Sequence, residues 1–473
     1  MLEATKEIVY AEIDFLPLKS YTNIVNANAL TTDWEEVVDK DKLSYIIGNP
    51  PFLGARVMSK AQKVDLLNVF DGYKGAGNLD FVSGWYLKSA QLMQGTEIQT
   101  ALVSTNSITQ GEQASLLWKI LIQDFSVSIN FAYKTFKWNS EAKNKAAVHC
   151  VIIGFGKDIA NKKIFETTEK VKNVSHINGY LAEASDIFIE NRTKPICSVP
   201  QMIFGSMPND GGALSNFSTE EKRDCKSYPQ AEQFFKKFVG ASEFINNKDR
   251  WTLWLYDVNP AEWRKIKPIY EAVDQVRKNR EASNRASTKK LAEVPYLFGE
   301  IRQPIGDYMI IPRVSSENRR YIPLGFTSPD VIASDAVQII PNASLYHFGI
   351  LTSNVHMAWM RTVAGRLKSD YRYSAKIVYN NFPWPEVTNE QEEKISQTAQ
   401  AILDARALYP DSSLADLYDE LTMPPELRKA HQANDKAVMQ AYGMTKEVDG
   451  KKTWLTESET VARLFEMYEA LAK

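Results

Sequence analysis

The sequence predicts an α/β protein with a doubly wound sheet in residues 1–160, an α+β domain in residues 200–385 and a helical C-terminal region in residues 386–473. Short apolar runs near residues 30, 47, 103, 130 and 152 have the length of buried strands, and helical patterns separate some of them. Polar clusters follow several of these runs, at the strand ends where open α/β sheets bind ligands. Residues 161–199 are largely polar and are expected to form a connector.

Composition and charge are those of an ordinary globular protein. The 473 residues allow two or three domains, and 44% of them are hydrophobic and 24% are charged. Because the net charge is −2, any nucleic-acid binding must depend on local basic patches. The three cysteines are widely spaced, no apolar stretch reaches membrane-spanning length, and there is no signal-peptide pattern. We therefore expect a cytoplasmic protein with reduced thiols, no metal site and no membrane contact.

An apolar run at residues 43–47 ends at a glycine, and the next four residues are Asn49, Pro50, Pro51 and Phe52. Neither proline can donate a hydrogen bond to a sheet, so the strand ends here and Asn49 lies at its carboxyl end. The Asn49 side chain offers an acceptor and donors, the Pro50 carbonyl can accept, and the Phe52 ring can stack. This set suits a planar substrate with an exocyclic amino group, although an isolated Asn-Pro pair is also a common turn.

The complete Asn-Pro-Pro-Phe element after an apolar strand resembles motif IV of the amino-group DNA methyltransferases, in particular those that methylate adenine at N6. The resemblance implies a Rossmann-like class I methyltransferase sheet in residues 1–160 and S-adenosylmethionine as the cofactor. It implies catalytic roles for Asn49, Pro50, Pro51 and Phe52.

Two further polar residues gain candidate cofactor-binding roles from this resemblance. Asn28 lies in an alternating run at residues 23–30 that is typical of a strand, and it matches motif III, whose polar residue faces the cofactor's adenine. Asp80 precedes a helical pattern and matches motif V, which lines the methionine side of the cofactor or the target pocket. Considered alone, Asn28 would more often be a turn former, and Asp80 would be a helix N-cap.

The stretch at residues 133–139 is basic and aromatic and lies between two apolar runs. If the sheet is parallel here, Lys137 and Trp138 lie at the same edge as Asn49. Aromatic rings in such a loop can stack on an extruded base, or they can simply pack the loop. His149 stands inside the second apolar run and is expected to be a core or hydrogen-bonded histidine.

One part of the expected fold is missing from the sequence. Methyltransferases of this kind carry a Gly-rich turn and a ribose-binding acid upstream of motif III, and neither is found before Asn23. The expected sheet is therefore N-terminally truncated, and the strand that precedes Asn49 has an unpaired edge. We predict that this chain alone binds S-adenosylmethionine poorly and does not methylate. An upstream N-terminal fragment, or a longer natural chain, is the expected complement.

Basic residues are concentrated in the second region despite the net negative charge. The segment from Arg277 to Lys290 has six basic residues and one acid, which by itself is usual for a solvated helix face. Two more clusters combine basic residues with Ser, Asn and Tyr, as phosphate positioning and base-edge contacts in double-stranded DNA require. The residues predicted to contact DNA are Lys137, Trp138, Arg277, Lys278, Arg280, Arg285, Arg313, Arg319, Arg366, Lys368 and Arg372.

The second region resembles the target-recognition domain of the single-chain type IIG/IIL restriction–modification enzymes. The likeness runs from Leu297–Pro304 to Tyr379–Pro385, where an Asn-Phe-Pro-Trp-Pro element leads into the helical tail. The tail is expected to pack on this domain, with a small helical interaction surface as the alternative. Such enzymes often carry a nuclease domain with a carboxylate-plus-lysine metal site, and nothing in this sequence supplies one.

The resulting hypothesis is a site-specific, adenine-specific DNA methyltransferase of a restriction–modification or phage-defence system. One alternative is a DNA-binding specificity subunit without catalysis, and another is methylation of cytosine at N4. A methyltransferase that acts on RNA or on protein glutamine also uses Asn-Pro-Pro with an aromatic residue. A glutamine methyltransferase, however, would not need the large basic second region.

Overall fold

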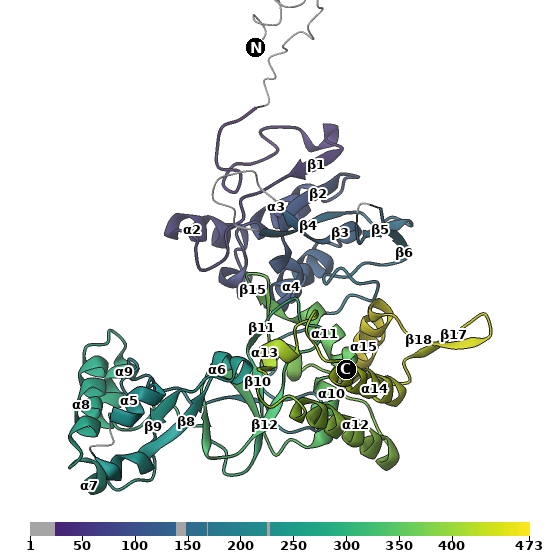
Figure 1. Cartoon of the computed structure of the whole chain (residues 1–473). Helices are drawn as coiled ribbons and strands as arrows, with labels where there is room; N and C mark the ends of the chain where they lie inside the picture. Colours follow the sequence, from purple (N-terminus) through teal and green to yellow (C-terminus); the bar gives the residue numbers. More distant parts are fainter. Residues whose placement is uncertain (1–23, 139–147, 168, 225–227) are drawn as a thin grey trace, which may run out of the picture.

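The computed structural model describes residues 24–138, 148–167, 169–224 and 228–473. Figure 1 shows a domain built on a large sheet at the top, a lobe with α8 and α9 at the lower left, and a body with the C-terminal helices at the lower right. We call these the sheet domain (residues 24–182), the lobe (residues 208–301) and the central body, which comprises most of the other residues.

The sheet domain has six strands in the order β1-β2-β4-β3-β5-β6. Their bounds are β1 (Tyr45–Gly48), β2 (Gln99–Thr105), β3 (Ser128–Trp138), β4 (Val148–Gly156), β5 (Lys162–Phe165) and β6 (Val171–Val174). β1 and β2 are parallel, whereas β4 is antiparallel to both β2 and β3. β1, β2 and β3 therefore run in one direction, and the residues that follow them lie at one edge of the sheet.

Aromatic side chains hold the helices of this domain against the sheet. The helices are α2 (Lys60–Val69), α3 (Ser83–Leu92) and α4 (Gly111–Lys119), with short turns η1 (Lys40–Lys42), η2 (Ala76–Asn78), η3 (Asn106–Thr109) and η4 (Ile120–Asp124). Tyr86 of α3 stacks on Phe155 of β4 with ring centroids 5.1 Å apart, and Trp118 of α4 packs edge-on against both rings. The Tyr86 hydroxyl also forms a hydrogen bond with Ser104 of β2 (2.9 Å). These contacts fix α3 and α4 on the sheet.

The strand expected at residues 23–30 is absent from the described residues 24–30, so that prediction is wrong for them. The Asn28 carbonyl instead accepts hydrogen bonds from the backbone N–H groups of Thr31 and Thr32, at 3.1 and 3.0 Å. A short alternating run can form a turn instead of a strand when a backbone carbonyl accepts hydrogen bonds from the N–H groups three and four residues later.

β1 has no partner on its outer side among the described residues. Tyr45 and Ile47 of this strand are 70% and 80% exposed, which is high for large apolar side chains. An unpaired strand with exposed apolar residues is a surface on which another strand can pair.

The basic and aromatic stretch at residues 133–139 was expected to be a loop, but β3 continues through it to Trp138. The register between β3 and β4 shifts between Tyr133 and Phe136. The strand is therefore irregular at the point where its sequence changes from apolar to basic and aromatic residues. Tyr133 stacks on Phe165 of β5 with ring centroids 4.1 Å apart, which helps to hold the extended strand.

The central body contains a four-stranded antiparallel sheet and a smaller three-stranded one. The first is β12 (Gly325–Thr327), β10 (Tyr308–Pro312), β14 (Val337–Pro341) and β7 (Ile203–Phe204), and the second is β11 (Val314–Ser315), β16 (Asp370–Arg372) and β15 (Gly365–Leu367). Helices α10 (Leu345–Leu351) and α11 (Asn354–Val363) and the π-turn η8 (Ala375–Tyr379) complete it. Gly111, at φ +55°, lies against Gly365, and a Cβ on Gly111 would come 3.2 Å from the Gly365 Cα. This close backbone approach joins the sheet domain to the small sheet.

The Asn-Phe-Pro-Trp-Pro element is buried and fastens the connector to the central body. The Asn381 side chain donates to the carbonyls of Glu190 and Lys376, at 3.0 and 2.8 Å. Asn380 donates to the Arg192 carbonyl (2.8 Å), and its own carbonyl accepts from the Ile196 N–H (2.8 Å). The prediction of a connector over residues 161–199 is therefore corrected: its first part forms β5 and β6 of the large sheet, and its later part is fixed to the central body instead of forming a free linker.

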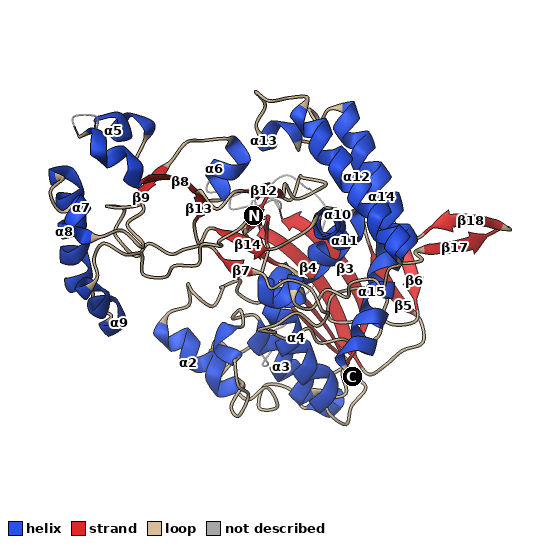
Figure 2. Cartoon of the chain, turned by 90° about the horizontal axis from the view of Figure 1, so that it is seen from below, coloured by secondary structure: helices blue, strands red, loops and turns tan. Residues whose placement is uncertain are grey.

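The C-terminal residues form helices that share one apolar core with the central body, as expected for a tail packed on this region. The elements are α12 (Asn389–Ala407), α13 (Leu414–Leu417), α14 (Pro425–Ala441), the hairpin β17 (Thr445–Val448) and β18 (Lys451–Trp454), and α15 (Glu457–Ala472). Figure 2 shows the hairpin projecting from the molecule beside α15. None of the helices in the described part of the chain has the length and apolarity of a membrane span.

The lobe packs its helices on a small sheet around a separate core that includes Phe235 and Trp263. Its elements are α5 (Thr219–Asp224), η6 (Pro229–Phe234), β8 (Phe235–Val239), α6 (Ala241–Asn246), β9 (Trp251–Leu253), α7 (Pro260–Trp263), α8 (Lys267–Glu281), α9 (Ala286–Lys290) and η7 (Leu291–Glu293), with β13 (Val331–Ala333) alongside β8.

Arg280 is the organising polar residue of the lobe. Its side chain is only 1% exposed, and its five N–H groups donate to five backbone carbonyls. The acceptors are the carbonyls of Pro208, Asn209, Leu291, Val294 and Leu297, at 2.8 to 3.1 Å. The prediction that Arg280 contacts DNA is therefore corrected, because no N–H group remains for a phosphate.

We predict that Arg280→Met lowers the free energy of unfolding by about 3 kcal/mol, because five buried carbonyls lose their donor. Urea unfolding followed by tryptophan fluorescence measures the change. Arg277→Met is the matched control, since Arg277 is exposed on the same helix, and it should change stability by less than about 0.5 kcal/mol. Equal stability of the two variants would contradict the structural role of Arg280.

Candidate functional site

The Asn-Pro-Pro-Phe loop follows β1 directly and lies at the carboxyl edge of the sheet. Asn49 and Pro51 are exposed, Phe52 is half-buried and Pro50 is buried. Within the described residues the Asn49 side chain makes no hydrogen bond, so its amide is available to a ligand. The Leu53 carbonyl accepts a hydrogen bond from the Phe81 N–H (2.9 Å), which ties the end of the loop to the segment before α3.

Asp80 connects the loop segment to the ends of two other elements. Its carboxylate is 6% exposed and accepts hydrogen bonds from the hydroxyls of Thr105 (3.0 Å) and Ser107 and from the Gln113 side chain (3.1 Å). The Gln113 side-chain oxygen in turn accepts from the Asp80 N–H (2.9 Å). The end of β2, the turn η3 and the first turn of α4 are thereby held beside the loop.

The N-cap interpretation of Asp80 is wrong. Helix α3 begins at Ser83, its N-cap residue is Val82, and no side chain caps it. The carboxylate is committed to long-range hydrogen bonds instead, which sequence spacing does not reveal. Its role toward the cofactor stays a prediction, and within this chain it positions its neighbours.

Asn28 is exposed and lies in the turn that precedes β1. Its side-chain oxygen accepts from the Leu30 N–H (3.1 Å), and its side-chain nitrogen donates to Asp65 of α2 (2.8 Å). The turn-former interpretation therefore describes the local structure. Contact of Asn28 with a cofactor stays a prediction.

Lys137 and Trp138 end β3 at the same edge as Asn49, because β3 runs in the direction of β1. Trp138 is 43% exposed, and its ring centroid lies 6.3 Å from that of Phe136. An exposed indole at this edge has a free face for stacking. His149 pairs with Lys137 across the two strands, and its ring faces Glu317 rather than the apolar core.

Apart from Lys137, most of the basic residues predicted to contact DNA lie either on the small sheet of the central body or in the lobe. Arg366, Lys368 and Arg372 belong to the β15–β16 hairpin, with Lys368 at φ +57° in its turn, and Arg313 lies next to the partner strand β11. Arg366 stacks on Tyr371, with its guanidinium carbon 3.7 Å from the ring centroid.

The remaining members of the set differ in exposure. Arg277 and Lys278 are exposed on α8 and share Asp274 as an ion-pair partner, and Arg285 is exposed before α9. Arg319 is half-buried, and burial lowers the pKa of its guanidinium. In Figure 1, α8 and α9 lie on the far side of the lobe from the β15–β16 hairpin.

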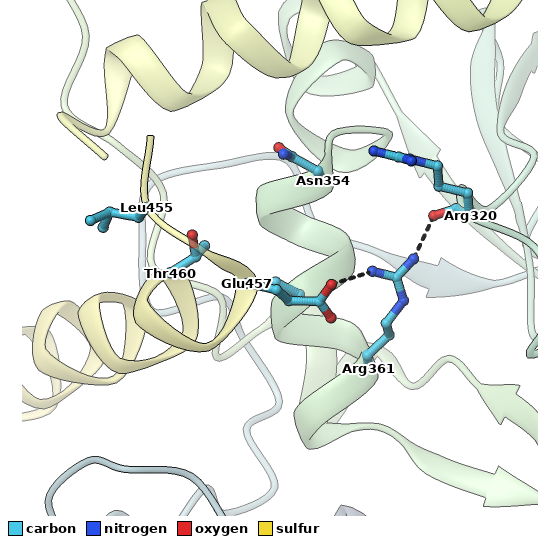
Figure 3. Close-up of a pocket in the computed structure, with 7 residues that line it drawn as sticks. Arg320, Asn354, Arg361, Leu455, Glu457 and Thr460 are labelled. Carbon is cyan, nitrogen blue, oxygen red and sulfur yellow. Dashed lines mark hydrogen bonds and ion pairs between the residues drawn. The ribbon is translucent and has the colours of Figure 1, made fainter. Parts of the chain in front are cut away.

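A cavity of about 380 Å³ lies between α11 and the start of α15, and none of the predicted site residues lines it. Figure 3 shows Arg361 bridging Glu457 (3.1 Å) and the Arg320 carbonyl (2.7 Å) in this cavity. Nearby, Asp435 accepts hydrogen bonds from the Tyr321 hydroxyl (2.6 Å) and the Asn354 N–H (2.8 Å), and burial raises its pKa to about 6. The described residues contain no cluster of three or more acidic, histidine or cysteine side chains suited to a metal ion.

Comparison with known proteins agrees with this geometry. Three models match consecutive parts of the chain: the DNA-methyltransferase domain of MmeI over residues 1–166, the target recognition domain of MmeI over residues 183–386 and the C-terminal domain of MmeI over residues 387–473. The sheet with its Asn-Pro-Pro-Phe loop and the attached basic region therefore define a DNA-methyltransferase fold with a target-recognition domain. The chain belongs to the MmeI family of restriction–modification proteins.

Two relatives are similar over nearly the whole chain. DNA methyltransferase A of Bacillus subtilis (strain 168) is 40% identical over 100% of this chain and 53% of its own length. The type IIL restriction–modification enzyme MmeI, solved in complex with DNA, is 44% identical with a TM-score of 0.87, and the match covers 99% of this chain and 63% of that one. The chain thus spans about half of the first relative and less than two thirds of the second.

We predict that Asp80→Asn destabilises the protein by about 1–3 kcal/mol, because an amide presents donors where three donors already converge. Thermal or urea unfolding measures the effect. Asp33→Asn is the control, since Asp33 is exposed and accepts only a local backbone hydrogen bond, and it should change stability by less than about 0.5 kcal/mol. A variant at position 80 as stable as this control would show that the carboxylate does not hold the loop segments.

Proposed function

We propose that this chain is the methyltransferase and DNA-recognition part of a restriction–modification enzyme that methylates N6 of an adenine flipped out of duplex DNA. The observation that carries the proposal is the exposed Asn49 amide, which has no hydrogen-bond partner within the described residues. It stands at the carboxyl end of β1, with Phe52 beside it in the loop and Lys137 and Trp138 at the same sheet edge. The basic hairpin of the attached recognition domain supports DNA as the substrate.

The adenine must leave the duplex, because N6 is otherwise paired and out of reach. The Asn49 side-chain oxygen and the Pro50 carbonyl then accept hydrogen bonds from the two amino hydrogens. These contacts direct the nitrogen lone pair away from the ring and orient it for in-line attack. The Phe52 ring stacks on the flipped base and excludes water from one face.

S-adenosylmethionine, when bound, supplies an activated methyl group to this nitrogen. The residues present fit the side of the site that receives the amine: Asn49 is free, and the Asp80 hydrogen bonds hold the adjoining segments in place. On the other side, the outer edge of β1 is open among the described residues. We propose that a polypeptide segment paired with this edge provides the rest of the cofactor site.

Cytosine N4 is also an exocyclic amine and can satisfy the same two acceptors. The contacts of Asn49 and Pro50 therefore do not by themselves distinguish the two bases. Mass spectrometry of nucleosides from methylated DNA distinguishes N6-methyladenine from N4-methylcytosine. A DNA-binding specificity subunit without catalysis would yield neither product.

We predict that Asn49→Ala lowers the methylation rate at least about 100-fold, because one of two acceptors for the amino group is lost. Methyl transfer to duplex DNA is measured with the chain complemented by the proposed segment that pairs with β1. Binding of the same duplex should stay within about twofold, since Asn49 acts only on the flipped base. Asn68→Ala, at an exposed position on α2, is the control. Full turnover by the Asn49 variant would refute the catalytic assignment.

We predict that the 473-residue polypeptide alone binds S-adenosylmethionine more weakly than the micromolar range and does not methylate DNA. Isothermal titration calorimetry measures the cofactor affinity, with and without an upstream polypeptide of the relatives' type. The added segment should restore binding if it pairs with β1, where Tyr45 and Ile47 are exposed. Micromolar binding by the isolated polypeptide would contradict this part of the proposal.

A further inference from the structure

A lysine, an arginine and a histidine surround one carboxylate at the junction of the sheet domain and the central body. The Glu317 carboxylate lies 3.4 Å from the Lys137 ammonium, 3.7 Å from His149 Nε2 and 3.7 Å from an Arg366 guanidinium nitrogen. Lys137 and His149 are paired across β3 and β4, whereas Arg366 comes from β15. Figure 1 shows β15 beside α4 of the sheet domain and β11 below them.

Hydrogen bonding at this junction is incomplete. Within the described residues, the Glu317 carboxylate accepts no hydrogen bond, although its side chain is only 22% exposed. The Arg366 Nε and His149 Nε2 atoms are buried without a hydrogen-bond partner. By contrast, the buried Asp210 carboxylate accepts from the Gly212 and Leu214 N–H groups, at 2.9 and 2.7 Å. A carboxylate with a purely structural role is normally bonded in this way.

Arg366 has contacts that hold its guanidinium in place without Glu317. The Arg366 guanidinium stacks on Tyr371 and donates to the Ser369 carbonyl (2.8 Å). The contact of Gly111 with Gly365 fixes the hairpin against the sheet domain. Lys137 and His149 are placed by the pairing of β3 with β4, so the three side chains form an anion-binding arrangement at the sheet edge that also carries Asn49.

We propose that Lys137, His149 and Arg366 form a binding site for a backbone phosphate of DNA, and that Glu317 occupies it in the free protein as an anion that DNA displaces. This inference rests on the proposed function in duplex DNA binding. A phosphodiester carries the same charge as a carboxylate, and its oxygens can accept the hydrogen bonds that Glu317 leaves unmade. Exposed Lys368 and Arg372 of the same hairpin extend the positive surface beyond the site.

Displacement of Glu317 makes every DNA complex less favourable by a fixed amount. The association constants of sequence-specific and phosphate-only complexes fall by the same factor, and the phosphate-only complexes, which are weaker to begin with, are the first to be lost at a given DNA concentration. Glu317 therefore suppresses binding to DNA of arbitrary sequence. Its removal should tighten binding to such DNA without any new base contact.

The test measures binding of the full 473-residue chain to a short mixed-sequence duplex at low salt. Glu317→Gln should raise the affinity about three- to tenfold, since the competing charge is lost. Arg366→Ala and Lys137→Ala should each lower the affinity and reduce the salt dependence by about one released counterion. Glu466→Gln on α15 makes the same change of net charge away from the site and should alter the affinity less than about twofold.

The outcomes separate this inference from the proposed function. If the wild-type chain binds the duplex and Glu317→Gln binds it equally or more weakly, Glu317 does not compete with phosphate and the inference fails alone. If neither protein binds duplex DNA, the DNA-recognition function fails together with it. Thermal unfolding of each variant confirms that the comparison is made between folded proteins.

Discussion

The placement of Asn49 depends on the hydrogen bonds that converge on the buried carboxylate of Asp80. Thr105, Ser107 and Gln113 belong to three successive segments, the end of β2, η3 and α4, and all three donate to it. The adjoining Phe81 N–H donates to the Leu53 carbonyl at the end of the Asn-Pro-Pro-Phe loop. The Asp80 carboxylate thus sets the spacing between the Asn-Pro-Pro-Phe loop and the turn η3. Since a short loop has little core of its own, this network gives the site its rigidity.

A backbone contact between α4 and β15 also fixes this part of the sheet domain relative to the recognition domain. Helix α4 carries Gln113 and begins at Gly111, whose α-carbon lies against Gly365 of the β15–β16 hairpin. A side chain at Gly111 would press on the Gly365 backbone, and the φ of +55° at Gly111 is itself unfavourable for other residues. The cationic residues of the hairpin are therefore held at a defined distance from the sheet edge, and the proposed DNA duplex would be presented to the Asn-Pro-Pro-Phe loop in one orientation.

The local features of the fold could be predicted from the sequence, whereas the long-range ones could not. The end of a strand before Pro50 and the strands near residues 103, 130 and 152 follow from proline chemistry and apolar runs. Arg280 was misassigned because it stands in a basic run. Its spacing from Ile269, Val273 and Val276 places it on the buried face of α8, which helical periodicity can reveal. The Asp449-Gly450 pair, a hairpin signal, was overlooked within a region expected to be helical.

The fastening of the connector by Asn380 and Asn381 bears on how recognition domains of this family can be exchanged. Their amides reach back across the primary structure to the carbonyls of Arg192 and Glu190, and the Tyr379 hydroxyl reaches the Pro200 carbonyl. A chimera that replaced only the residues between these two segments would take both segments, and so all of these hydrogen-bond partners, from one parent. A chimera cut inside either segment would combine halves that evolved apart. Crossover points for engineered specificity therefore belong between the two segments, after Pro200 and before Tyr379.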